Sequence, residues 1–203
     1  MKYLTNFFIL FFLTFSIYSE SAKDVIKKSE DLVRGKTSQA IIKMNIKKIR
    51  IDRTIKFIAY DDRNKDAFFI KILEPSKDKG ISFLKVKNNL WQYLPSVGKI
   101  IKIESSMMAD SWMGSDFTNE DLVKGASIVD NYEHSFLDSS NKEIYKIEMK
   151  AKPDSAVVWE KIIVEIYKKT YLPKIYYYYD HKNRLKKIMK FYDYKQIQNR
   201  TNL

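Results

Sequence analysis

Cysteine is absent from this chain of 203 residues, and histidine occurs only twice. Without cysteine there are no disulfide bonds, no thiolate metal sites and no cysteine nucleophile. His134 and His181 lie far apart in the sequence, in settings typical of turns and sheet edges, so we expect both at the surface. None of the five glycines has the spacing of a phosphate-binding loop. The sequence therefore predicts a protein that is not an enzyme, with no catalytic residue, no metal site and no cofactor.

Long apolar runs are missing as well, except at the start of the chain. Residues 7–17 are almost wholly apolar, follow Lys2, and are too short to span a bilayer comfortably. Small residues come next, at Ser19 and Ser21. This order predicts a secretory signal peptide over residues 1–21, cleaved near Ser19 or Ser21. An uncleaved N-terminal anchor helix is the alternative. No cysteine follows the run, so the chain has no site for lipid attachment through that residue.

Acidic residues are too few to balance the basic ones. The formal net charge is +12 at pH 7, and the pI is about 9.5. Lysine alternates with apolar residues along the predicted strands, which indicates that it is the ordinary solvent-facing residue. A basic surface suits nucleic acid, anionic lipid head groups or an acidic partner. Because the chain is predicted to be exported, we expect no nucleic-acid binding and a transient contact with an anionic membrane surface.

Beyond the apolar start, the sequence predicts one helix followed by strands. Residues 21–35 place Val25, Ile26 and Leu32 on one face of a helix, and Gly35 stands where a left-handed residue would end it. From Ser38 the apolar period changes to two, which predicts about ten strands. Their short, even spacing favours an antiparallel sheet that curls toward a barrel. The first two strands contain the alternating residues Ile42, Met44 and Ile46, and Ile55, Phe57 and Ala59. The others are expected near residues 66–73, 81–87, 90–94, 99–103, 126–138, 143–151, 157–167, 171–179 and 185–197.

Two of these strands carry specific expectations about burial. The strand at 66–73 is nearly all apolar, which favours burial on both faces. The four consecutive tyrosines at 176–179 must place rings on both faces of their strand, with one pair toward the interior. The hairpin that joins 81–87 to 90–94 turns at Asn88 and Asn89, residues that tolerate a positive φ.

The stretch from Trp91 to Asp121 gathers the unusual residues of the chain. It holds two of the three tryptophans, three of the seven methionines and two of the five glycines. Thr118 and Asp121 have the spacing of a helix capping box with aspartate in place of glutamate. Flexible methionines beside a large apolar surface suit shape-tolerant binding of an apolar ligand. The alternative is a core hairpin with a tight turn and no ligand.

The same stretch resembles the LolA-like outer-membrane lipoprotein-sorting proteins of the LolA/LolB superfamily. In that group a W-x-Y-x-P strand end precedes a basic strand and then an F/W-M-G-S-D-F loop. The matching residues here are Trp91, Tyr93, Pro95, Lys99, Lys102, Trp112, Met113, Gly114, Ser115, Asp116 and Phe117. The resemblance extends from about residue 22 to the end of the chain. Members of the family usually continue with further strands after the equivalent of Ile197, whereas this sequence stops soon after it. The difference bears on how completely the sheet closes.

The resemblance implies a mainly β fold with some α structure. Its core would be a curved antiparallel sheet that forms an incomplete, half-open β-barrel covered by short helices. Residues 22–203 would then be a single lipid-carrier domain. A strongly curved sheet that its own side chains do not fill leaves an apolar cavity.

By resemblance, the protein is a monomeric periplasmic chaperone that carries lipoproteins or other lipids from the inner to the outer membrane. Its partners would include an inner-membrane transporter and an outer-membrane acceptor. The alternatives are a lipid-binding accessory of a membrane exporter and, in another class, a protein-interaction or envelope-stress sensing module.

Candidate binding residues follow from this reading in two groups. Alternate residues of the strands would line the cavity, and the methionine-rich loop would be its movable gate. The expected wall is Phe57, Phe69, Phe83, Trp91 and Tyr93, and the expected gate is Met107, Met108, Trp112, Met113 and Phe117. Gly114, Ser115 and Asp116 complete the family signature; Ser115 and Asp116 have the alternative role of holding the turn or capping the short helix.

Overall fold

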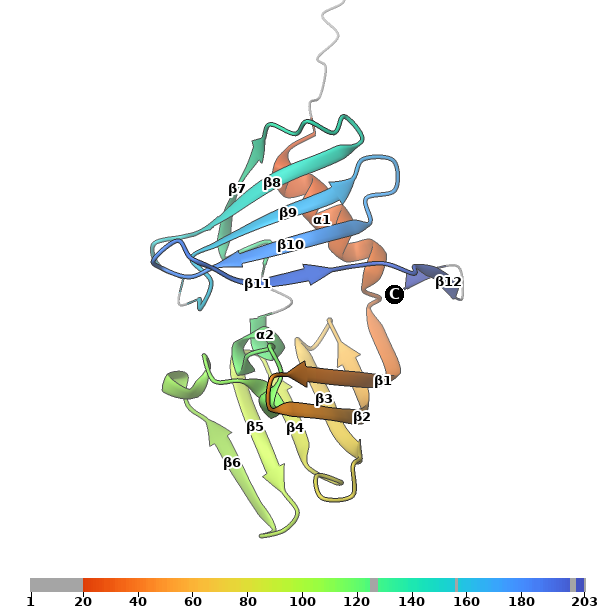
Figure 1. The fold of residues 1–203 in the computed structure, drawn as a ribbon, viewed down its shortest axis with the longest axis vertical. Coiled ribbons are helices and arrows are strands. Elements are labelled where there is room, and N and C mark those ends of the chain that lie inside the picture. The colour runs from red at the N-terminus through yellow and green to blue at the C-terminus, as the bar shows by residue number, and fades with distance from the viewer. Residues whose placement is uncertain (1–19, 125–127, 156, 198–199, 203) are drawn as a thin grey trace, which may run out of the picture.

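The computed structural model describes residues 20–124, 128–155, 157–197 and 200–202. About half of these residues lie in strands, which form two antiparallel sheets in succession along the chain and one short two-stranded ribbon (Figure 1). The predicted fold class, an incomplete barrel of antiparallel strands covered by short helices, is confirmed. The strands divide between two sheets, however, where one continuous sheet was expected.

The first sheet contains six strands in sequence order, each antiparallel to the next. They are β1 (Thr37–Lys48), β2 (Ile51–Asp62), β3 (Ala67–Glu74), β4 (Ser82–Val86), β5 (Asn89–Leu94) and β6 (Lys99–Ile103). Alternate residues of every strand point to the concave face, where they pack as one hydrophobic core. In β3 these are Phe68, Ile70 and Ile72, whereas Lys71 faces solvent. The expected burial of this strand on both faces is therefore wrong.

The second sheet has the order β11-β10-β9-β8-β7. Its strands are β7 (Tyr132–Leu137), β8 (Ile144–Ala151), β9 (Lys161–Tyr167), β10 (Pro173–Tyr179) and β11 (Leu185–Lys190), and the ribbon is β12 (Lys195–Ile197) with β13 (Arg200–Asn202). In β10, Tyr176 and Tyr178 are buried inside, while Tyr177 and Tyr179 are half-buried on the other face. The prediction that the four tyrosines place rings on both faces of their strand is confirmed.

The helix α1 (Ala22–Val33) precedes the first sheet in sequence but packs on the second sheet (Figure 1). Val25 and Ile26 share a core with Tyr176 and Tyr178 of β10. Ser21 begins the helix with a capping box, because its hydroxyl accepts from Asp24 N and the Asp24 carboxylate accepts from Ser21 N. The chain leaves the helix in an extended conformation at residue 34.

The expectation for Gly35 is wrong. Among the described glycines, a positive φ occurs at Gly80, Gly98 and Gly114. Since the residue before Gly35 is already extended, the helix ends without a left-handed cap.

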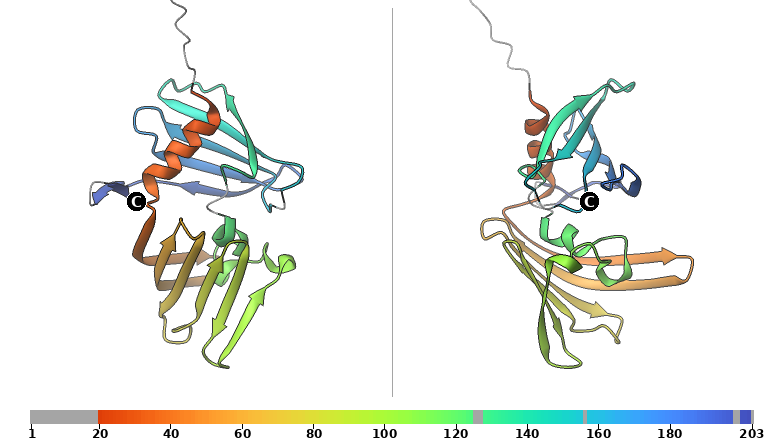
Figure 2. Two further views of the ribbon diagram at one scale, coloured as in Figure 1. Left: turned by 180° about the vertical axis from the view of Figure 1, so that it is seen from behind. Right: turned by 90° about the vertical axis from the view of Figure 1, so that its left-hand side faces the viewer.

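The segment between the sheets holds the methionine-rich loop and three short helical turns. These are η1 (Ser105–Met107), η2 (Trp112–Gly114) and α2 (Asn119–Lys124). Figure 2 shows the loop and α2 on the concave side of the first sheet, in the angle that it makes with the second. Within the described residues, none of the helices combines the length and the apolar character that a membrane-spanning helix needs.

Candidate functional site

A cavity of about 410 Å³ lies where the two sheets meet α1 and α2. Its volume falls in the lower part of the roughly 300–1,000 Å³ range of small-ligand pockets. It exists because each sheet has its own hydrophobic core, and the side chains of the two cores do not fill the angle between the sheets. Most of the lining is apolar and comes from both halves of the chain. The apolar and aromatic residues are Val33, Ala59, Tyr60, Phe68, Ile70, Leu122, Tyr176, Met189 and Phe191.

Charged residues complete the cavity wall. They come from α1, from β2 and β4 of the first sheet, and from α2. The charged lining residues are Glu30, Arg34, Asp61, Lys85 and Asp121. Arg34 donates through one guanidinium nitrogen to both carboxylate oxygens of Asp61, at 3.2 and 3.0 Å. The cavity thus joins an apolar wall to charged groups, a combination that suits an amphipathic ligand.

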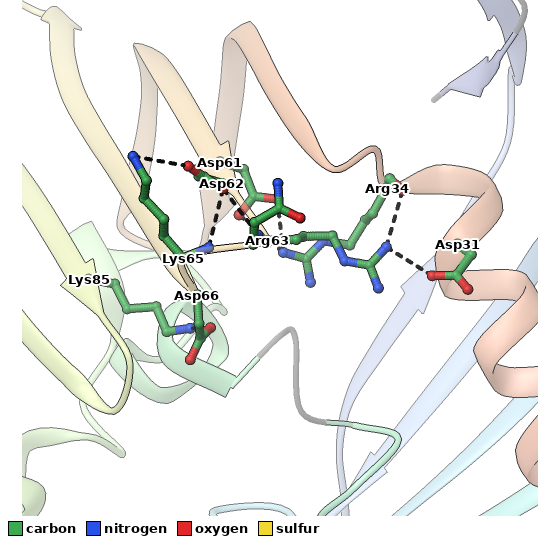
Figure 3. Close-up of polar contacts among 9 residues, drawn as sticks. Asp31, Arg34, Asp61, Asp62, Arg63, Lys65, Asp66 and Lys85 are labelled. Atoms are coloured by element: carbon green, nitrogen blue, oxygen red, sulfur yellow. Dashed lines mark hydrogen bonds and ion pairs between the residues drawn. The ribbon is translucent and has the colours of Figure 1, made fainter.

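A cluster of ion pairs ties α1 to the turn between β2 and β3 (Figure 3). Arg63 lies 2.9 Å from the Asp31 carboxylate, and it donates to the backbone carbonyl of Arg34 at 3.3 Å. Its backbone N–H also donates to Lys36 O at 2.9 Å. Because α1 packs on the second sheet, these bonds hold the two sheets together beside the cavity.

Lys85 is a buried lysine on the concave face of β4. Only 4% of the residue is exposed, and its Nζ donates to the carboxylate of Asp66 (Figure 3). Asp66 occupies the β2–β3 turn with a φ of 47°. Lys85 is an exception to the expectation that lysine is the ordinary solvent-facing residue, since it follows Phe83 on the inward-facing alternation.

Glu30 brings a carboxylate from α1 to the cavity wall. Burial raises the pKa of this group above the ordinary glutamate value, and the charges of Arg34 and Arg63 oppose part of the rise. The protonated form of such an acid stabilises the fold. That contribution is fully present below the pKa of the unfolded chain and is lost as the pH rises through the pKa of the folded chain.

We therefore expect Glu30→Gln to raise the free energy of unfolding at neutral pH, because it removes a carboxylate that the cavity wall disfavours. The gain should shrink as the pH falls below the ordinary glutamate pKa of 4.5, where the wild-type carboxyl is protonated. Urea denaturation at neutral and acidic pH measures both values. Glu133→Gln, at an exposed position of β7, is the control. An equal gain for the two variants, or a gain independent of pH, contradicts the prediction.

Asp121 of α2 is the centre of a hydrogen-bond network that joins α2 to the second sheet. Its carboxylate accepts from Thr118 N at 2.7 Å, from Lys187 Nζ at 2.7 Å and from Trp159 Nε1 at 3.1 Å. Thr118 Oγ1 accepts from Asp121 N in return, at 3.1 Å, so the predicted capping box is present. The neighbouring Glu120 carboxylate accepts from Val158 N at 2.8 Å.

Lys187 is the second buried lysine, with 7% of its side chain exposed. Its ammonium lies 4.1 Å from the ring centroid of Tyr178, 4.9 Å from that of Trp159 and 5.4 Å from that of Phe117. These rings and the Asp121 carboxylate replace part of its hydration. Burial lowers the pKa of Lys187, and the attraction of Asp121 opposes the change.

The methionine-rich loop places Trp112 against the concave face of the first sheet. Trp112 is 3% exposed, and its ring meets Phe57 and Phe83 edge-on at centroid distances of 5.4 and 5.6 Å. Met108 and Met113 are partly buried around the same core, whereas Met107 is 40% exposed. Trp112 thus fills the part of the concave face over which the loop lies.

The signature residues hold this loop in shape. Met113 and Gly114 both have a positive φ, 52° and 76°, which reverses the chain after Trp112. The buried Ser115 hydroxyl donates to Trp112 O at 2.7 Å and accepts from Phe117 N at 3.1 Å. The exposed Asp116 pairs with Lys48 at 3.0 Å. Ser115 therefore has the turn-holding geometry that was its alternative role.

The predicted cavity wall is split between the two faces of the first sheet. Strand pairing places Phe57 and Phe83 on the concave face, and Phe69, Trp91 and Tyr93 on the opposite one. Phe57 and Phe83 belong to the core under Trp112. The five residues do not line a single surface, since strands β3 and β5 present their even-numbered residues to the core and β2 and β4 their odd-numbered ones.

The predicted gate residues lie beside the cavity. Of the described residues that line it, none belongs to the set Met107, Met108, Trp112, Met113 and Phe117. The loop reaches the wall through α2, which contributes Asp121 and Leu122. Sequence reasoning missed Lys187 and Trp159. The sequence does contain one sign of their position. Lys187 alternates with Met189 and Phe191, which predicts that it points to the same, apolar face of its strand.

The two histidines differ in their surroundings. His181 is exposed, as expected, whereas His134 is half-buried in β7, and burial lowers its pKa. Within the described part of the chain, no three or more histidine, aspartate or glutamate residues form a group that could hold a metal ion.

A family model with the description "-like: Uncharacterized protein" matches residues 64–202, more than half of the chain. The chain belongs to this family. The match includes β3 to β6, the loop with α2 and the whole second sheet, and hence most of the cavity wall. A comparison with the curated proteins gives no match.

Three solved structures share the fold of this family member. A domain described as outer membrane lipoprotein-sorting, from Vibrio parahaemolyticus, is 22% identical over 88% of this chain and 80% of that one, with a TM-score of 0.77. A DUF1329 family protein from Desulfovibrio piger ATCC 29098 is 22% identical over 89% and 81%, with a TM-score of 0.79. A LolA superfamily protein from Nitrosomonas europaea is 16% identical over 91% and 83%, with a TM-score of 0.73. The LolA-like fold predicted from the sequence is confirmed.

Proposed function

We propose that this LolA-like chain is a periplasmic, non-enzymatic carrier. It would take up one acyl chain of a lipoprotein or another lipid and carry it from the inner to the outer membrane. The observation that supports this most directly is the apolar cavity between the sheets, with its charged groups from α1, β2, β4 and α2. The acyl chain would occupy the apolar part, and the polar part of the lipid would lie near the charged groups.

The size of the cavity favours a single chain. Burial of hydrocarbon contributes about 0.8 kcal/mol per methylene, so a dozen buried methylenes contribute roughly 10 kcal/mol. Several chains bound together would reach an affinity from which release is slow. A cavity of about 410 Å³, lined by residues that remain partly exposed, supports binding that is strong enough for transport and still reversible.

The movable cover in this proposal is α2 with the preceding loop. Asp121 and Leu122 form part of the wall, and α2 is fastened to the second sheet mainly through Asp121 and Glu120. Opening has to break only these few polar bonds, whereas Trp112 anchors the other end of the loop in the core. Opening would therefore lift α2 and leave the Trp112 turn in place.

Filling the cavity tests the carrier function. Ala59 lines the cavity on the concave face of β2, so Ala59→Leu adds three carbon atoms where the acyl chain would lie. At about 0.8 kcal/mol per displaced methylene, we expect the affinity for cis-parinaric acid to fall by more than about tenfold. Fluorescence titration of the purified, delipidated protein measures this affinity.

Ala67→Leu is the matched control. Ala67 lies on the opposite face of the adjacent strand and is half-buried, like Ala59. The same substitution there should leave fatty-acid binding unchanged. Equal affinities for all three proteins, or no acyl material on the wild-type protein by mass spectrometry after purification, would argue against a carrier and for an interaction module.

The folded contacts of Glu20 and Ser21 bear on signal-peptide cleavage, although residues 1–19 lie outside the described part. The Glu20 carboxylate accepts from the hydroxyls of Tyr145 and Tyr171 at 3.1 Å and pairs with Lys28. Ser21 caps α1. Cleavage after Ser21, the other predicted position, would remove both contacts.

We therefore expect the exported protein to begin at Glu20. Intact-mass measurement of the protein from the periplasmic fraction gives its first residue directly. A mature chain that begins at Ala22 contradicts this prediction, and retention of residues 1–19 supports the anchor helix instead.

A further inference from the structure

The outer face of the first sheet carries an exposed apolar surface. One row of paired residues crosses it from β2 to β5: Tyr60, Phe69, Leu84 and Trp91. Adjacent strands lie about 4.8 Å apart, so these side chains are direct neighbours. The rows beside it add Ile41, Ile58, Val86, Tyr93 and Ile100. We call these nine residues the outer patch.

The outer patch is open to solvent. Ile100 is 71% exposed, Ile41 64%, Leu84 42% and Tyr60 41%. In the described part of the chain, α1 packs on the second sheet, and the loop and α2 lie on the concave side of the first (Figure 2). Contiguous exposed apolar surfaces of this kind mark protein or membrane interaction sites.

Lysines surround the outer patch on the same face. Lys102 pairs with Trp91, Lys71 pairs with Ile58, and Lys43 lies two residues from Ile41. Among the described residues, none of these three lysines forms an ion pair. Two carboxylates nearby are already paired: Glu74 lies 3.4 Å from Lys56, and Asp62 lies 3.7 Å from Lys65. The surface is therefore apolar at its centre and positive around it.

We propose that the outer patch docks the protein on the surface of an anionic bilayer. Tryptophan and tyrosine favour the water–lipid boundary, and lysine stems reach over apolar surface while their charges meet anionic head groups. The net charge of +12 adds long-range attraction to such a surface. A second copy of the chain is a poorer occupant, because a symmetric dimer through this face would bring the same lysines together.

Apart from Tyr60, which also lines the cavity at its edge, the residues of the outer patch are separate from the cavity wall. A convex face that rests on the membrane leaves the opposite, concave side free, where the cavity, α2 and the loop lie. It would nevertheless serve the proposed carrier, which has to remain at a membrane long enough to take up or release a lipid.

Vesicle flotation tests the proposal with protein purified from cells that express the full chain. We expect binding to vesicles of phosphatidylglycerol and phosphatidylcholine at low salt, and little binding to phosphatidylcholine alone. Leu84→Ser should weaken binding about tenfold, and Lys71→Gln or Lys102→Gln about fivefold each, with the lysine effects lost at high salt. On binding, the emission of Trp91 should shift to shorter wavelength, and Trp91→Phe should remove that shift.

Ile188→Ser is the matched control, because Ile188 is 49% exposed on the outer face of the second sheet. It should bind vesicles like the wild type. Ala59→Leu should do so too, which separates docking from acyl-chain uptake. Wild-type binding by Leu84→Ser would overturn the proposal. So would a wild-type dimer that Leu84→Ser converts to a monomer, because the occupant would then be a second copy.

Discussion

Trp112→Ala is expected to lower the free energy of unfolding by about 3–5 kcal/mol, the usual cost of truncating a buried aromatic residue. Trp112 is 3% exposed and packs edge-on against Phe57 and Phe83. Alanine would leave a cavity where the loop now lies against the sheet. For a chain of this size the midpoint of thermal unfolding should fall by roughly 6–20 °C. Urea denaturation and thermal melting measure the two values.

Two control variants separate packing from other effects. Trp91→Ala removes the same side chain from the opposite face of the same sheet, where it is only half-buried, and should cost markedly less. Trp112→Phe keeps an aromatic ring and removes an indole N–H that has no hydrogen-bond partner among the described residues, so we expect a loss below about 1.5 kcal/mol. Equal losses for Trp112→Ala and Trp91→Ala would show that the loop does not depend on the Trp112 contact.

Asp121→Asn should be the second severely destabilising change, with a loss of about 3–5 kcal/mol. It leaves the ammonium of Lys187 buried among three rings without a carboxylate, and it removes the charge that accepts from Trp159 Nε1. Lys187→Met should cost less. The Asp121 carboxylate keeps the N–H groups of Thr118 and Trp159 as donors after that change.

The double variant Asp121→Asn with Lys187→Met completes the thermodynamic cycle. Because it removes both charges together, it should recover most of the stability that Asp121→Asn loses. Urea denaturation of the four proteins gives the coupling energy. If the double variant is as unstable as Asp121→Asn alone, hydrogen bonding by the carboxylate determines the stability, and the ion pair contributes little.

Local sequence patterns predicted much of the fold. The period of two located the strands of both sheets, the apolar face at Val25 and Ile26 located α1, and the Thr118–Asp121 spacing located the start of α2. Each of these signals is carried by residues a few positions apart. The division into two sheets was not predictable in this way, because it depends on the missing pairing between β6 and β7, which no local pattern encodes.

The cavity wall was the least predictable part. The residues of the wall come from both sheets, α1, α2 and the segment that follows β11. The shape of the wall therefore depends on how the two sheets meet. For Lys85 and Lys187 the sequence predicts a solvent-facing position, because lysine is almost always exposed. Both lie on the apolar alternation of their strands, beside Phe83 and Met189, and that position was the available sign of burial.

The placement of α1 has a consequence for how the chain folds. Val25 and Ile26 belong to the same buried core as Ile147, Val164 and Tyr176, more than a hundred residues further along. The helix leaves the ribosome first, yet the strands that receive it are synthesised last. The first sheet pairs neighbouring strands throughout and needs no such wait. We expect α1 to dock late, in a slow step that closes a long loop, with its apolar face open to chaperones until then.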